Sequence, residues 1–226
     1  MTNSILIVVA HSDDETIGMG GTIKNHTSKG DNVFLISMTD GVSAWSNKSK
    51  NLVEERIKAS EKASSILNFK WERRFSFPDN QMDNCSILEI VKSIEEVKFK
   101  IQPKIVYTHS SSDLNIDHGI VSRSVLTAFR PQPNEHCNEI RLFEVPSATD
   151  FGHEDITGNF KPNLFINISD SWPYKLKALN AYSSEMKIYP HTRSLESIKN
   201  LAKWRGNQVG LDLAEAFQVI RKIDIC

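Results

Sequence analysis

The stretch ILIVVAHSDDETIGMGG, residues 5–21, carries the strongest structural signals in the chain. It begins with six consecutive apolar residues, as expected of a strand that is covered on both faces of a parallel sheet. His11 ends this run, and three acids follow within four residues: Asp13, Asp14 and Glu15. Adjacent carboxylates repel one another, so such a cluster is costly unless a cation lies among them. The stretch therefore predicts a buried strand that delivers a cation-binding group to its carboxyl end.

Strand-like and helix-like patterns alternate along the rest of the chain. Strands are predicted at 5–10, 32–41, 104–113, 139–147 and 164–169 and within 71–83, and helices at 15–29, 51–67, 86–99, 118–129, 172–187 and 194–205. For residues 210–223 the periodicity does not decide between strand and helix. This alternation predicts an α/β fold: a Rossmann-like, mostly parallel sheet with helices on both faces, formed by one domain over 1–226.

Polar segments follow three of the predicted strands, at residues 11–15, 39–41 and 109–118. In open parallel sheets, ligands bind beyond the carboxyl ends of the strands. We therefore expect these three segments to lie along one edge of the sheet and to form a site there.

A dinucleotide site is the main structural alternative, because a strand, a glycine-rich turn and a helix also form that motif. Here the glycines follow the acids, and the third glycine of GxGxxG is absent. Three acids at the turn would also repel a pyrophosphate. A nucleotide cofactor is therefore disfavoured.

A metal site fits the residues better. His11 and Asp14 are three residues apart, and a tight turn can aim both at one point, where an imidazole nitrogen and a carboxylate oxygen are ordinary zinc ligands. A catalytic zinc usually has a third protein ligand, and His118 on another strand tip can supply it. Asp13 can then accept a proton from the attacking water. Glu15 either supports the ligands or favours the helix N-terminus.

The composition bounds the remaining possibilities. The formal net charge is −1, which favours neither nucleic acid nor an anionic membrane as a partner. The three cysteines, Cys85, Cys137 and Cys226, are widely spaced and indicate neither disulfides nor a thiolate zinc site. No basic n-region or membrane-length apolar run is present, so a cytoplasmic protein without a membrane span is expected.

Two motifs together resemble those of the PIG-L or LmbE-like family of metal-dependent N-deacetylases. They are AHSDDETIGMGGTI (10–23), in which Ser12 replaces the proline of the family's AHPDDE, and DLNIDHG (113–119). The resemblance extends over most of the chain through SMTDG (37–41), FPDNQMD (77–83), KALNAYSSE (177–185), YPHTRS (189–194) and RGNQVGLDLAEAF (205–217).

The resemblance implies a role for each matching residue. His11, Asp14 and His118 would bind zinc, with ferrous iron as the alternative metal, and Asp13 would be the general base. Asp117 would support the site from behind the ligands. It does not easily bond the adjacent His118, so it could instead orient another group. Arg56 and Asp79 would contact the substrate.

One departure from the family pattern affects the proton donor. Many members carry a histidine three residues before the metal-binding one, whereas this chain has Asn115, which can donate a hydrogen bond to an oxyanion but cannot transfer a proton. The acid for the departing amine is then Asp13, His109 or His191. His109 and His191 are also expected near the substrate, although a strand-end histidine bonded to backbone is an equal alternative for His109.

The implied activity is hydrolysis of the N-acetyl group of an N-acetylhexosamine, carried on a nucleotide sugar or a surface-glycan precursor, with release of acetate and a free amine. The expected partner is a small amino-sugar substrate, and a homo-oligomer is compatible with the sequence. Two alternatives remain: a metal-dependent amidase acting on a non-sugar amide, and a non-catalytic module that binds sugars or nucleotides.

Overall fold

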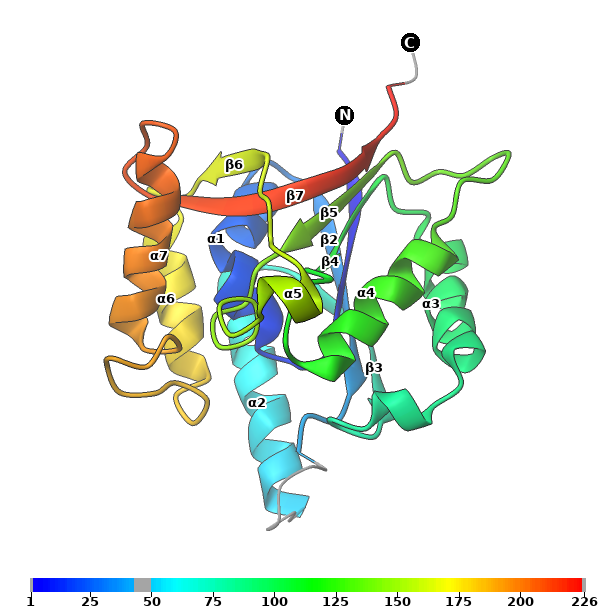
Figure 1. The fold of residues 1–226 in the computed structure, drawn as a ribbon, viewed down its shortest axis with the longest axis horizontal. Coiled ribbons are helices and arrows are strands. Elements are labelled where there is room, and N and C mark those ends of the chain that lie inside the picture. The colour runs from blue at the N-terminus through cyan, green and yellow to red at the C-terminus, as the bar shows by residue number, and fades with distance from the viewer. Residues whose placement is uncertain (1, 43–49, 225–226) are drawn as a thin grey trace.

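The strands form one seven-stranded sheet in the order β3-β2-β1-β4-β5-β7-β6 (Figure 1). This computed structural model describes residues 2–42 and 50–224. The strands are β1 (Ser4–Val9), β2 (Asn32–Thr39), β3 (Lys70–Phe77), β4 (Ile105–His109), β5 (Glu139–Phe143), β6 (Leu164–Asn167) and β7 (Ala214–Lys222). The helices are α1 (Asp14–Ser28), α2 (Lys50–Leu67), α3 (Ile87–Ile101), α4 (Ile116–Ala128), α5 (Glu154–Thr157), α6 (Trp172–Ala181) and α7 (Leu195–Asn207), with a short 3-10 turn η1 (Met82–Asn84).

Helices cover both faces of this sheet, which confirms the predicted α/β class. β1 through β5 are parallel, whereas β7 runs antiparallel to both β5 and β6. Ile5, Ile7 and Val9 of β1 pack into the core under α1, α2, α6 and α7, while the alternate residues Leu6 and Val8 pack into the core under α3 and α4 (Figure 1). Burial of both sets explains the unbroken apolar run at residues 5–10.

The structure settles the secondary structure of one segment that the sequence left open and shortens one predicted helix. Residues 210–223, which periodicity left open, contain the strand β7. The helix predicted over 172–187 ends at Ala181. Beyond it, the buried hydroxyl of Tyr182 donates to Glu15, and Glu185 pairs with Arg56, so these side chains are held toward the edge of the sheet that carries the candidate site.

The glycines of α1 allow close packing of the helix. A Cβ at Gly18 would lie 2.5 Å from the ring of Phe143, and one at Gly21 would lie 2.7 Å from Cβ of Ile168. The helix is kinked at Met19, and the buried Glu215 accepts the backbone N–H groups of Gly21 and Thr22 beyond the kink. This glycine-rich stretch therefore seats a helix on the sheet.

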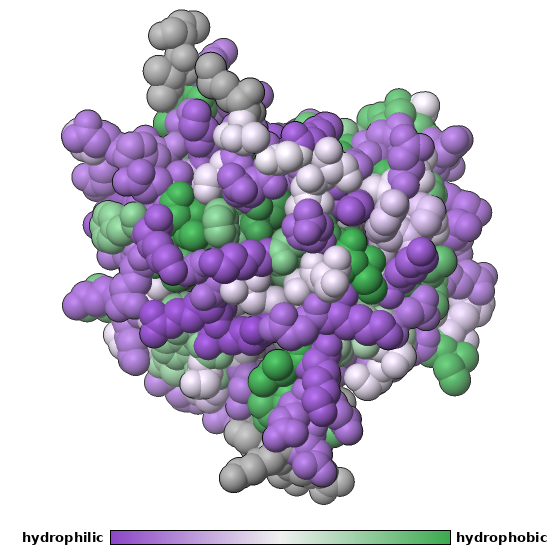
Figure 2. All heavy atoms as spheres, turned by 180° about the vertical axis from the view of Figure 1, so that it is seen from behind, coloured by the Kyte–Doolittle hydropathy of each residue, from purple (hydrophilic) through white to green (hydrophobic). Residues whose placement is uncertain are grey.

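The face drawn in Figure 2 is mainly hydrophilic, and its hydrophobic residues form small separate groups. Among the described residues, none of the helices is both long enough and apolar enough to cross a membrane. Cys85 and Cys137 are free thiols, and Cys226 lies outside the described residues.

Candidate metal and catalytic site

The three predicted polar segments meet at the carboxyl ends of β1, β2 and β4, as expected. β1 lies between β2 and β4, and the chain order reverses there, so the site lies at the topological switch point of the sheet. The backbone N–H of Ala10, which follows β1, donates to Nε2 of His109 at the end of β4 (2.8 Å). This bond ties together the two strand ends that carry the site.

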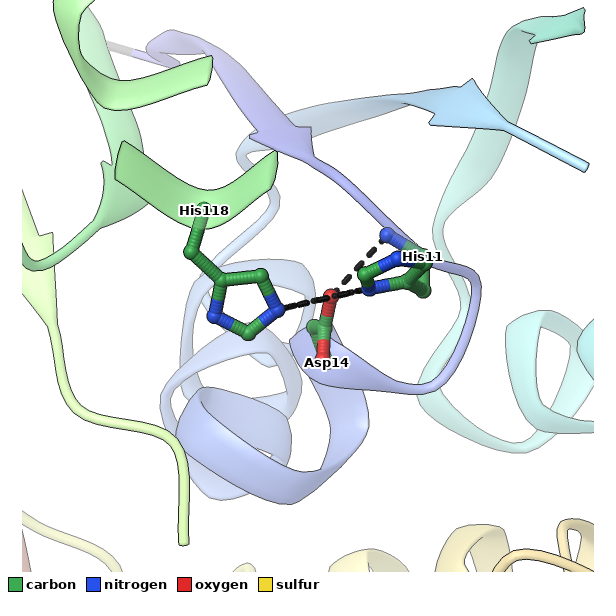
Figure 3. Close-up of side chains that lie close together, drawn as sticks. All are labelled: His11, Asp14 and His118. Carbon is green, nitrogen blue, oxygen red and sulfur yellow. Dashed lines mark hydrogen bonds and ion pairs between the residues drawn. The ribbon is translucent and has the colours of Figure 1, made fainter. Parts of the chain in front are cut away.

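His11, Asp14 and His118 converge on one point, although 107 residues separate the two histidines (Figure 3). Oδ2 of Asp14 lies 3.2 Å from Nδ1 of His11 and 3.3 Å from Nε2 of His118. The two ring nitrogens lie 3.3 Å from each other. Three donors of a tetrahedral zinc ion, with bonds of about 2.0–2.2 Å, would be separated by about 3.3–3.6 Å, so the spacing of these three atoms fits such an ion.

The charge around this point also fits a cation. The five carboxylates of Asp13, Asp14, Asp79, Asp113 and Asp117 are buried close to it. Burial alone disfavours the protonated form of His118, but Asp14 and Asp113 outweigh it and raise its pKa. Burial likewise opposes the charged form of Asp14, yet His118 and His11 hold its pKa well below the ordinary value. Buried negative charge in this excess is stabilised by a bound metal ion.

Asp113 fixes the orientation of His118. The backbone N–H of Val145 donates to Oγ1 of Thr149 (2.8 Å), this hydroxyl donates to Oδ1 of Asp113 (2.5 Å), and Oδ2 of Asp113 accepts from Nδ1 of His118 (2.8 Å). With a proton held on Nδ1 by Asp113, Nε2 of neutral His118 is the nitrogen that can bind a metal at the point shared with Asp14. A carboxylate behind a ligating histidine is a recurrent feature of zinc sites.

Asp117 lies against His11 and not against His118, its neighbour in sequence. Its carboxylate accepts the backbone N–H groups of Asn80 (2.7 Å) and Met82 (3.1 Å) and lies 3.5 Å from Nε2 of His11. Oδ1 of Asp79 lies 3.0 Å from the same Nε2. Asp79, expected as a substrate contact, is thus buried against His11, although it still lines the pocket described below.

Asp13 is adjacent in sequence to Asp14 and contacts two arginines. Nη2 of Arg56 donates to Oδ1 (2.9 Å), and Nη1 of Arg193 donates to Oδ2 (3.3 Å). Arg56 is itself buried and also pairs with Glu185 (2.9 Å). Gly41 allows this arrangement, because its φ is +67° and a Cβ there would lie 2.7 Å from Nε of Arg56. The predicted general base is therefore held in place at both carboxylate oxygens.

Glu15 points away from the convergent donors and into the protein. The hydroxyls of Thr16 (2.8 Å) and Tyr182 (2.9 Å) donate to its Oε1. Burial raises the pKa of Glu15 to about 8. Its role in the structure is to connect the start of α1 to the segment that follows α6.

His109 and His191, both expected near the substrate, are not among the described residues that line the pocket next to His11. His109 has no exposed surface, its Nε2 accepts from the backbone of Ala10, and its ring stacks on His118 at 3.8 Å. Burial holds the pKa of His109 well below its ordinary value, which favours the neutral ring. His109 therefore accepts a backbone hydrogen bond at the end of its strand, which was the alternative to a substrate contact. His191 does not line the pocket among the described residues, and its Nδ1 accepts the backbone N–H of Arg193.

Asn115 has a local structural role at the rim. Its Oδ1 accepts the N–H of Asp117 as the N-cap of α4, and its Nδ2 donates to Oδ1 of Asn80 (3.2 Å). A pocket of about 250 Å³ opens next to Asn115, and His11 and Asp13 are part of its lining. Its lining residues are His11, Asp13, Gly41, Arg56, Asp79, Asn80, Asn115, Glu185, Lys187 and Arg193. The lining is mostly polar and charged, which suits a hydroxyl-rich ligand.

The sequence analysis assigned no role to Asp113, Glu185, Lys187 or Arg193. Glu185 and Arg193 lie within the segments KALNAYSSE and YPHTRS, which carried the family resemblance. That resemblance was the available signal for them, but neither segment follows a strand, so the rule that pointed to the other site residues did not apply.

Comparison with known proteins agrees with the fold and the two motifs. A probable N-acetyl-alpha-D-glucosaminyl L-malate deacetylase 2 of Bacillus cereus is 26% identical over 193 residues, which cover 82% of this chain and 84% of the relative. A diacetylchitobiose deacetylase of Thermococcus kodakarensis is 25% identical over 228 residues, covering 96% of this chain and 82% of the relative.

A solved structure has the same fold. The N,N'-diacetylchitobiose deacetylase of Pyrococcus horikoshii superimposes with a TM-score of 0.78 at 23% identity, covering 96% of this chain and 83% of the other. The family model PIG-L, described as GlcNAc-PI de-N-acetylase, matches residues 6–129, a span that includes His11, Asp14 and His118. Because this match covers more than half of the sequence, the chain belongs to the PIG-L family.

Proposed function

We propose that this protein is a zinc-dependent N-deacetylase that hydrolyses the acetamide of a small N-acetylhexosamine-containing molecule, such as a nucleotide sugar or a surface-glycan precursor. The observation that carries the proposal is the convergence of His11, Asp14 and His118 next to a polar pocket that His11 and Asp13 line. The two relatives, named as deacetylases of N-acetylglucosamine-type substrates, support the same reaction class.

His11, Asp14 and His118 would hold the metal. Zinc supplies Lewis-acid chemistry in such a site and lowers the pKa of a coordinated water to about 7. Two histidines and one carboxylate also suit ferrous iron, which is the alternative metal.

The protein's own residues account for the proton transfers. Asp13 accepts a proton from the water whose oxygen bonds to the acetyl carbon. Asp13 then returns this proton to the nitrogen as the carbon–nitrogen bond breaks, so acetate and a free amine leave. Arg56 and Arg193 keep the Asp13 carboxylate in one position throughout.

Asp13→Asn tests this mechanism. The variant should bind zinc as the wild type does and lose most of its rate of acetate release, by about 10²–10⁴-fold, because an amide cannot accept the proton. Asp155→Asn, at an exposed position on α5, is the matched control and should retain full activity. A zinc-loaded Asp13→Asn protein with a near-normal rate would show that Asp13 is not the base.

Metal and substrate are tested together. Metal analysis of the purified protein should find zinc, and acetate release from a panel of N-acetylhexosamines should stop when a chelator removes it. The panel should also include N-acyl amino acids, because activity confined to them would favour the non-sugar amidase. A protein with no hydrolytic activity that binds the same sugars would favour the non-catalytic module.

A further inference from the structure

Arg193 lies on the segment between α6 and α7 and reaches the centre of the site. Its Nε donates to Oγ of Ser147 (2.7 Å), and its Nη1 donates to Oδ2 of Asp13 (3.3 Å). Nη2 lies 3.9 Å from Oδ1 of Asp14, beyond hydrogen-bond distance. The guanidinium group is therefore fixed between Asp13, the proposed base, and Asp14, one of the three proposed metal ligands.

Donors of this guanidinium remain available for a ligand. Of its five N–H groups, the contacts described above use the one on Nε and one on Nη1, so neither N–H group of Nη2 takes part in them, and the side chain lines the pocket. Asp13 does not depend on Arg193 alone for charge compensation, because Arg56 already pairs with its other oxygen at 2.9 Å. The side chain of Arg193 is 18% exposed, and the residue lines the pocket.

Hydrolysis of an acetamide develops negative charge on the acetyl oxygen. Preorganised donors aimed at that oxygen stabilise the charge most effectively when water is largely excluded. Asn115, the neutral amide at the rim, has one hydrogen of Nδ2 engaged by Asn80 and its Oδ1 engaged by the backbone. Arg193 offers a permanent positive charge in addition to its donors.

We propose that Arg193 is a catalytic residue that donates hydrogen bonds to the oxyanion of the tetrahedral intermediate. This inference rests on the proposed deacetylase function. Arg193 keeps all its protons during the reaction, since the proton of the attacking water passes to Asp13 and from there to the leaving nitrogen. A group that only holds Asp13 in place is the competing explanation.

The two explanations differ in what Arg193 recognises. The probes are the methylphosphonamide of glucosamine, in which an anionic tetrahedral phosphorus replaces the planar acetyl carbon, and glucosamine itself. With zinc-loaded protein, Arg193→Ala should weaken binding of the phosphonamide by about 10²–10³-fold, the range for loss of one oxyanion donor, and change glucosamine binding less than about threefold. Arg123→Ala, an exposed arginine of α4, is the matched control and should change neither affinity.

Kinetics on the best N-acetylhexosamine of the panel give a second readout. Arg193→Ala should lower kcat by a similar factor with little change in KM, and added guanidinium ion should restore part of the rate. If Arg193→Ala does not fold, Arg193→Lys replaces it, because lysine keeps the positive charge and lacks the paired N–H donors of the guanidinium group. For this variant kcat should fall at least about tenfold while the zinc content is retained.

Equal losses of affinity for both probes, or no loss for either, would overturn the role of Arg193 while leaving the deacetylase function intact. A wild-type protein that hydrolyses no N-acetylhexosamine would instead overturn the proposed function, and with it this inference.

Discussion

At the scale of single residues, the carboxylates around His11 and His118 make separate contacts. Asp14 converges with the two histidines, Asp113 orients His118, and Asp117 lies behind His11. The motif DLNIDH therefore contains one supporting acid for each histidine, at positions four residues apart.

The assignment of Asp113 leads to a prediction about metal affinity. Thr149 and His118 donate to different oxygens of Asp113, and in Asp113→Asn an NH2 group replaces one of these acceptors, so the two bonds that fix His118 cannot both form. We expect the Kd for zinc, measured by competition with a chromogenic chelator, to rise about 10–100-fold. Asp155→Asn should leave it unchanged. An unaltered zinc affinity in a folded Asp113→Asn variant would contradict the assignment.

At the scale of elements, α1 positions the site because its glycines allow it to pack closely on the sheet and on the segment that leads to α6. The helix starts at Asp14, so any shift of its axis moves a predicted ligand. Gly21 contacts Ile168, and Gly18 contacts Phe143, at distances that leave no room for a side chain.

Gly21→Ala should therefore destabilise the protein. The added methyl group would lie 2.7 Å from both Cβ and Cγ2 of Ile168, and overpacking of this kind costs about 1–3 kcal/mol in the free energy of unfolding. Gly119→Ala in α4, where nothing lies within 4 Å, is the matched control and should gain about 0.5–1 kcal/mol. Urea unfolding measures both.

A double variant separates the clash from other effects of the methyl group. The double variant Gly21→Ala/Ile168→Ala should lose less stability than the sum of the losses of the two single variants, because Ile168→Ala removes the side chain that the added methyl group meets. If Gly21→Ala and Gly119→Ala change stability equally, close packing of α1 is not the reason for the glycine.

At the scale of the whole molecule, a polar cluster at the opposite end of the sheet links α1, β4 and β5. Nδ1 of His26 bonds to Asp31 (2.7 Å), and its Nε2 bonds to the hydroxyl of Tyr107 (2.8 Å), which also accepts from Arg141 (2.5 Å). Burial lowers the pKa of His26, although Asp31 counteracts it; Arg141 and Lys29 add to the lowering.

The contribution of His26 to global stability should therefore decrease as the solution becomes acidic. In the unfolded chain His26 binds a proton near its ordinary pKa of about 6.5, whereas in the folded protein it stays neutral to lower pH. At this residue the unfolded state then binds more protons, so the contribution of His26 to the free energy of unfolding falls as pH drops below about 6.5. His26→Gln should reduce the difference in stability between pH 7.5 and 5.5, measured by urea unfolding, whereas His136→Gln, at an exposed position, should keep the wild-type difference.

The sequence by itself determined the alternation of strands and helices. A strand buried on both faces requires an apolar run such as residues 5–10, and a helix buried on one face requires a stripe of apolar residues. It also placed His11, Asp14 and His118 at one edge, since parallel strands bring their carboxyl ends together.

Tertiary structure alone decided the partners of those residues. Arg193 and Glu185 reach the site from a segment after α6 that follows no strand, and the pairing of Asp113 with His118, and of Asp117 with His11, depends on how a turn is packed. The buried ring of His109 accepts a hydrogen bond from the backbone of Ala10, and the position of His109 at a strand end allows this bond without requiring it. Such choices depend on distances between segments far apart in the chain, and local periodicity carries no information about those distances.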